Sequence, residues 1–223
     1  MRVLHISPLY AQPVDGLPTQ AATTGFYWVS CTRSELEAQL PAIQTMLTRL
    51  GGSALADPAV TEALVEGQVA LAVLQWSGAG QQELSLSWQR MQVPADVARF
   101  ANRAAAMPRA FQGSDTAVGQ AITAALAQFA AVPDCSRQVI DISGDGQENT
   151  GFTDARARAA AVAQGTIINA IAIEEPGPAF PITTYYRNRI LTPGGFVVTA
   201  RGLGDYAGTL RLKLLRELAK PIG

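Results

Sequence analysis

One stretch, residues 139–151, constrains the fold of this chain more than any other. It reads Val-Ile-Asp-Ile-Ser-Gly-Asp-Gly-Gln-Glu-Asn-Thr-Gly. The first half is apolar and β-branched, and the second half is rich in Gly, Asp and Asn, which indicates a buried strand followed by a polar turn. In open α/β sheets, ligands bind at the carboxyl ends of the strands. We therefore expect the polar groups of this turn to lie at a binding site.

Side chains alternate along a strand, so the aspartates of this stretch can be assigned to one side. Asp141, Ser143 and Asp145 share that side, and Ile140 and Ile142 take the other. At about 3.3 Å per residue, Asp141 and Asp145 would lie roughly 13 Å apart, too far to share one metal ion. Asp145, between two glycines, is the functional candidate. Asp141 is expected to be structural, and if buried it needs a partner such as Arg or a backbone amide.

The rest of the chain alternates between strand and helix patterns. We expect strands at residues 25–30, 69–76, 84–88, 166–173 and 196–200 besides the central one. Helices are expected at 35–50, after Asp57, at 97–107, from Thr116, and at 153–164 and 204–220. This order predicts an α/β fold: a doubly wound, mostly parallel, Rossmann-like sheet with one antiparallel edge strand and helices on both faces.

Two details of this prediction concern the ends of the chain. Residues 1–25 contain three prolines and only a weak strand signal at 3–6, so we expect an irregular arm before a domain at 26–220. In the closing helix the period places Tyr206, Leu210, Leu214 and Leu218 inward and Lys213, Arg216 and Lys220 outward.

Composition excludes several classes of partner. The chain has 223 residues, of which 48% are hydrophobic and 16% charged, with a formal net charge of -1. This charge balance offers no basic surface for nucleic acid or for a membrane.

The uncharged run 116–133 approaches transmembrane length, but its glutamines favour a buried helix over a membrane span. No export signal is visible near the amino terminus, so the localisation stays open.

The two cysteines, Cys31 and Cys135, would lie at opposite ends of the sheet. A disulfide needs Cα atoms within about 7 Å, so we expect two free thiols.

Three features coincide along the chain: a hydroxyl-rich loop after an early strand, a loop threonine that enters a helix, and a strand that ends in Asp-Gly. Together they resemble the von Willebrand factor type A domain, over roughly residues 26–220. The segment 139–151 looks like a bacterial branch of that family known as a domain of unknown function. Supporting segments are residues 57–60 (Asp-Pro-Ala-Val), 73–78 (Val-Leu-Gln-Trp-Ser-Gly) and 116–119 (Thr-Ala-Val-Gly).

The resemblance implies a metal-ion-dependent adhesion site. That site consists of an Asp-x-Ser-x-Ser loop, a threonine and a later aspartate. By position, Ser30 and Thr32 match the two hydroxyls, Thr116 the threonine and Asp145 the later aspartate, but Trp28 stands where the first aspartate belongs. Because Mg²⁺ takes about six oxygen ligands and gains most from charged ones, we predict weak or absent binding of Mg²⁺, Mn²⁺ or Ca²⁺. The missing aspartate and export signal also suggest an amino terminus that is divergent relative to exported relatives.

The resemblance also implies a protein partner, which would approach a rim at the carboxyl end of the sheet. In a complete site an acidic side chain of the partner finishes the coordination of the metal. The rim residues beside the metal set are Ser114, Asp115, Gly146, Glu148 and Asn149. We therefore expect a non-catalytic, protein-binding module.

Two other functions stay open. One is a metal-assisted hydrolase that uses Asp145, for which the sequence offers no obvious base. The other is a purely structural assembly domain. Nucleophile motifs are not met around Ser143, His5 is the single histidine, and position twelve of an EF-hand-like loop is Phe152 rather than Glu.

Overall fold

The computed structural model describes residues 2–7, 52–111, 115–174 and 181–218. Its strands are β1 (Arg2–Ser7), β2 (Ala70–Trp76), β3 (Gln82–Arg90), β4 (Gln138–Gly144), β5 (Ile167–Glu174) and β6 (Val197–Arg201). Its helices are α2 (Pro58–Glu66), α3 (Pro94–Ala105), α4 (Val118–Gln128), α5 (Asp154–Ala163), α6 (Ile182–Tyr185) and α7 (Tyr206–Leu218). Short turns of helix are η1 (Phe129–Ala131), η2 (Tyr186–Ile190, a π-helix) and η3 (Leu203–Asp205).

The strands form one six-stranded sheet in the order β3-β2-β1-β4-β5-β6. Every neighbouring pair is parallel except β2 and β3, which form an antiparallel hairpin at the edge. Every residue of β2 is buried, as a strand covered on both faces requires, whereas most of β3 is only partly buried. The predicted fold class is confirmed, including its single antiparallel edge strand.

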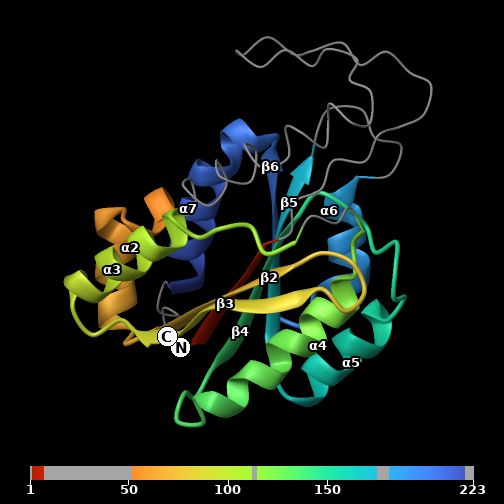
Figure 1. The fold of residues 1–223 in the computed structure, drawn as a ribbon, viewed down its shortest axis with the longest axis horizontal. Coiled ribbons are helices and arrows are strands. Elements are labelled where there is room, and N and C mark those ends of the chain that lie inside the picture. The colour runs from red at the N-terminus through yellow and green to blue at the C-terminus, as the bar shows by residue number, and fades with distance from the viewer. Residues whose placement is uncertain (1, 8–51, 112–114, 175–180, 219–223) are drawn as a thin grey trace.

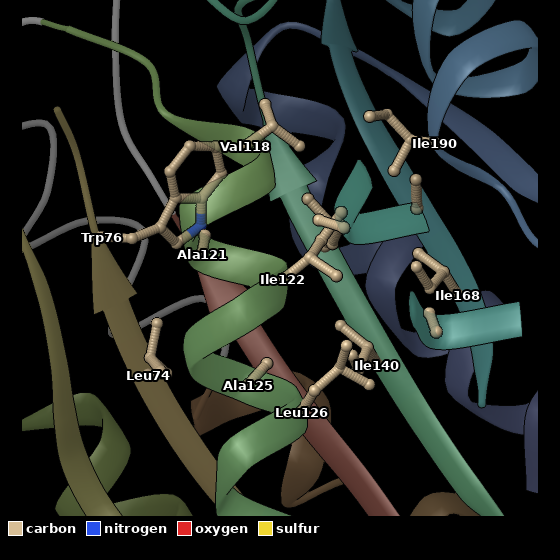
Figure 2. Packing of buried hydrophobic residues seen from close by; sticks show 14 of the residues in the cluster. Leu74, Trp76, Val118, Ala121, Ile122, Ala125, Leu126, Ile140, Ile168 and Ile190 are labelled. Atoms are coloured by element: carbon tan, nitrogen blue, oxygen red, sulfur yellow. The ribbon is translucent and has the colours of Figure 1, made fainter. Parts of the chain in front are cut away.

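Helices cover both faces of the sheet, with α2, α3 and α7 on one side and α4, α5 and α6 on the other (Figure 1). On the second face, Ile140 of β4 lies in one buried cluster with Val118 and Ile122 of α4 (Figure 2). Ile142 of β4 belongs to the same cluster. The opposite face buries residues of β2 and of all three facing helices, namely Val60, Leu64, Leu71, Val73, Val97, Phe100, Leu210 and Leu214. Two apolar layers therefore fix the sheet between the helices.

The amino-terminal segment differs from the prediction of an irregular arm. Residues 2–7 form β1, which lies at the centre of the sheet and pairs with both β2 and β4. The segment forms a strand despite its weak local signal because hydrogen bonds to neighbouring strands on both edges stabilise it. Pro8 follows the last residue of the strand in sequence. The strand expected at 25–30 and the helix at 35–50 lie outside the described residues, and the division at residue 26 stays a prediction.

The predicted orientation of Lys213 in α7 is wrong. Its side chain is 1% exposed and contacts both Asp141 and Glu217, which are equally buried. Asn169 of β5 donates to Glu217 Oε1 at 2.6 Å. The buried Asp141 carboxylate explains why a residue on the apparently polar side of the helix turns inward, since a buried charge needs a partner. Asp141 thus has the structural role predicted for it, but its partner is a lysine.

No helix in the described ranges is long and apolar enough to cross a bilayer. Of the two cysteines, Cys135 is a free thiol, and Cys31 lies outside the described residues.

Candidate functional site

The candidate site lies where β4 ends, next to the amino terminus of α4. Burial of β4 continues to Gly144, and the chain then leaves the sheet in the loop 145–153. Asp145 is partly buried at the start of this loop, and Thr116, 3% exposed, precedes α4. The strand and the helix therefore bring together two residues that are 29 positions apart in sequence.

Close approach at Gly146 joins these two residues. A Cβ atom at this position would lie 3.0 Å from Thr116 Oγ1, which is tighter than ordinary van der Waals contact. The absence of a side chain allows the Thr116 hydroxyl to sit against the backbone of the Asp145 loop. The structure thus places the Thr116 hydroxyl against Gly146, the residue after Asp145.

Asn149 fixes the backbone of Thr116. The Thr116 amide donates to Asn149 Oδ1 at 2.7 Å, and the amides of Asn149 and Thr150 donate to the Thr116 carbonyl at 3.0 and 3.3 Å. The Asn149 side chain therefore forms part of the framework of the site.

Glu148 binds the amino termini of two helices at once. Its Oε1 accepts from the Gly119 amide of α4 at 3.1 Å, and its Oε2 accepts from the Asp154 amide of α5 at 2.8 Å. The two helices touch here, since a Cβ atom at Gly119 would overlap the backbone of Thr153 and Asp154.

The turn between β2 and β3 completes the rim on the other side. Ser77 Oγ donates to the Asp115 carbonyl at 3.1 Å, and the Ala117 amide donates to the Ser77 carbonyl at 2.9 Å. Gln120 of α4 accepts from the Gly80 amide at 2.8 Å. Asp115 itself is exposed and lies over the turn at residue 78.

A polar cluster behind the loop supports α5. Arg189 contacts Asp154 with an Nη2 to Oδ1 distance of 3.1 Å, and the Tyr185 hydroxyl donates to Asp154 Oδ2 at 3.2 Å. Burial opposes ionisation, but the hydrogen bond and charge of Arg189 lower the pKa of Asp154 below its usual value. Burial raises the pKa of Tyr186 well above its usual value, and the charges of Tyr185 and then of Asp145 raise it further.

The described residues alone do not fit a divalent metal ion. Thr116 and Asp145 supply one hydroxyl and one carboxylate, well below the six or so oxygens that Mg²⁺ takes. Within the described ranges, no group of three or more His, Cys, Asp or Glu residues could hold a metal. Ser30, Thr32 and Ser114, and Trp28 in place of the aspartate, lie outside those ranges.

Sequence reasoning missed several residues that shape the site: Ser77, Gln120, Tyr185, Tyr186 and Arg189. Their roles depend on contacts between distant segments, which local patterns do not show. The role of Glu148 could have been suspected from the residue before α4. Ala117, whose side chain cannot accept a hydrogen bond, stands at the N-cap of α4, so this helix needs an acceptor from elsewhere.

Solved structures with a similar architecture include a von Willebrand factor type A domain, a pilus adhesin and a matrix protein of the mussel byssus. The chain is similar to "von Willebrand factor type A from Catenulispora acidiphila", with a TM-score of 0.61 and 16% identity over 99% of this chain and 43% of that one. It is also similar to the pilus adhesin SpaC from Lactobacillus rhamnosus GG, with a TM-score of 0.58 and 11% identity over 78% of this chain and 28% of that one.

A third similar structure is proximal thread matrix protein 1 from the mussel byssus "with zinc occupied MIDAS motif". Its TM-score is 0.57, with 13% identity over 97% of this chain and 45% of that one. The chain spans less than half the length of these three solved proteins. At such identities the likeness defines the fold: a von Willebrand factor type A-like domain.

The family follows from the sequence itself. Residues 48–222 match the family described as "Protein of unknown function (DUF1194)", and the chain belongs to that family. It is thus a branch of the von Willebrand factor type A-like domains, as the segment 139–151 predicts. No curated protein matches the chain.

Proposed function

We propose that the chain is a non-catalytic, protein-binding module whose partner contacts the rim around Asp145. The fold supports this proposal, since its solved neighbours include a pilus adhesin and a byssus matrix protein. A shared fold does not by itself imply a shared function. The proposal therefore depends on the properties of the rim in this chain.

The observation that carries the proposal is an exposed aromatic side chain in a firmly held loop. Phe152 is 79% exposed and has a φ of 46°, a left-handed conformation that a bulky residue rarely adopts. Such strain persists only where the surroundings determine the backbone, and it clusters at functional sites. Here Glu148 and Asn149 hold the loop from within. An exposed aromatic side chain on a rigid support is a typical anchor at a protein interface.

Photo-crosslinking from the rim tests this function. A photoreactive residue at Gln147, which is exposed in the loop, should capture a defined protein in the native host. The same residue at Gln164, exposed at the far end of α5, is the matched control. The proposal predicts a product from Gln147 alone that is lost on Asp145→Ala. Equal products from both positions, or a product that survives Asp145→Ala, would contradict a partner site at this rim.

The second part of the proposal is that metal contributes little to this binding. Trp28 replaces a charged ligand, and Asp145 is the single carboxylate of the inferred set. Calorimetric titration with Mg²⁺, Mn²⁺ and Ca²⁺ should show no saturable binding below millimolar concentrations. Tight binding that is lost in both Thr116→Ala and Asp145→Ala would show instead that the site is intact.

A further inference from the structure

Glu148 was predicted to face a partner, yet both of its carboxylate oxygens face inward. Oε1 accepts the Gly119 amide at 3.1 Å, and Oε2 accepts the Asp154 amide at 2.8 Å. Hydrogen bonds from amides to a charged acceptor are stronger than neutral ones. Each oxygen of the side chain therefore already accepts one backbone amide before any partner arrives.

The N-cap residues of the two helices that Glu148 binds make no side-chain caps. The N-cap of α4 is Ala117 and that of α5 is Thr153, and neither side chain makes a capping hydrogen bond. The first amides of a helix need acceptors, and a carboxylate there also interacts favourably with the helix dipole. One carboxylate from a third segment accepts one of these amides from each helix, and in α5 the Asp154 side chain accepts the next amide, that of Ala155.

This arrangement has a geometric consequence for the rim. Thr116 stands two residues before α4, and Asp145 stands three residues before Glu148. Fixing α4 to Glu148 therefore limits how far the Thr116 hydroxyl can move from the Asp145 loop. On the other side, Arg189 and Tyr185 bind the Asp154 side chain and so hold the start of α5.

We infer that Glu148 is a positioning residue: it joins the amino termini of α4 and α5 and thereby holds Thr116 against the Asp145 loop. Its effect on partner binding rests on the function proposed above. A residue in this role acts through the geometry of the rim and makes no contact with the partner.

Glu148→Gln tests this inference with little change in shape. A glutamine offers one carbonyl oxygen to one amide but turns an NH₂ donor toward the other. Amide exchange measured by NMR should become about tenfold faster at Gly119 or Asp154, because one buried amide loses its acceptor. Exchange at Thr116 should become faster as well. Glu62→Gln, the same change at an exposed position of α2, is the matched control and should alter none of these amides.

The crosslinking yield from Gln147 distinguishes a Glu148 that positions the rim for a partner from a Glu148 that only caps the two helices. In Glu148→Gln we expect this yield to fall at least threefold under conditions in which circular dichroism shows that the variant is fully folded. Faster exchange with an unchanged yield would overturn the positioning role and leave the proposed function intact. If the wild type gives no crosslink, the proposed function fails, and exchange at Thr116 then decides the inference: faster exchange in Glu148→Gln supports it, and unchanged exchange overturns it.

Discussion

Replacing Lys213 with methionine should destabilise the protein strongly although no rim residue changes. Lys213, Asp141 and Glu217 are each at most 2% exposed, and the lysine contacts both acids. Methionine keeps most of the apolar length of the side chain but removes the charge. The Asp141 carboxylate would then remain buried without its cation.

The size of this effect follows from the burial. Removing one partner of a buried ion pair costs about 3–5 kcal/mol, because the remaining charge is left uncompensated. In a domain of this size each kcal/mol lowers the melting temperature by about 2–4 °C, so we expect a decrease of roughly 6–20 °C. Overpacking should add little, since the side chains have similar volumes.

Urea unfolding followed by circular dichroism measures this change. Arg211→Met is the matched control on the same helix: the Arg211 pair with Asp57 is 40% and 21% exposed, so its loss should cost less than about 1 kcal/mol. Adding Asp141→Asn to Lys213→Met should restore at least half of the lost stability, because the charge is then removed from both sides. A Lys213→Met variant within about 1 kcal/mol of the wild type, or no recovery in the double variant, would refute the reasoning.

Three further predictions follow from the same contacts. Burial, and then the charge of Asp141, raise the pKa of Glu217 well above 4.5, so the folded state retains a proton that the unfolded state loses. This contribution to stability is complete below pH 4.5 and decreases as the pH rises toward the folded pKa, by up to about 1.4 kcal/mol per pH unit. Urea titrations at several pH values should show that the free energy of unfolding depends less on pH in Glu217→Gln than in the wild type. The same pH dependence in both proteins would contradict a retained proton. Gly119→Ala should lower the free energy of unfolding by about 1–3 kcal/mol, because the methyl group overlaps the start of α5, whereas the same change at Gly208, which has open space, should not. Phe152→Gly should leave stability unchanged or raise it by relieving a positive φ while it weakens capture at the rim, and a large loss of stability would show that Phe152 serves the fold.

Local sequence patterns predicted the elements whose environment is set by their own composition. The apolar runs of β2, β4 and β5 and the alternation in β3 predicted these strands, their mostly parallel orientation and the antiparallel edge. The position of Asp145 at the end of β4 followed from the same pattern. These features are local, because hydrophobic periodicity reports burial directly.

The features that sequence reasoning missed depend on distant partners. Residues 2–7 carry a weak strand signal, and their central place follows from pairing with two neighbouring strands. Lys213 lies on the polar side of α7 by period and turns inward because of Asp141, 72 positions away. Glu148 looks like an exposed loop acid until two helix amino termini are placed beside it. Each of these cases is decided by tertiary contacts and not by propensity.

The most direct test of a partner-binding rim is the affinity of the protein captured from Gln147, measured by biolayer interferometry. We predict that Asp145→Ala weakens binding at least about tenfold, the loss of one hot-spot contact, while exchanging Mg²⁺ for EDTA changes the affinity by less than about threefold. An affinity that is unchanged by Asp145→Ala would contradict a binding site at this rim. An affinity that is abolished by EDTA would contradict binding that needs little metal.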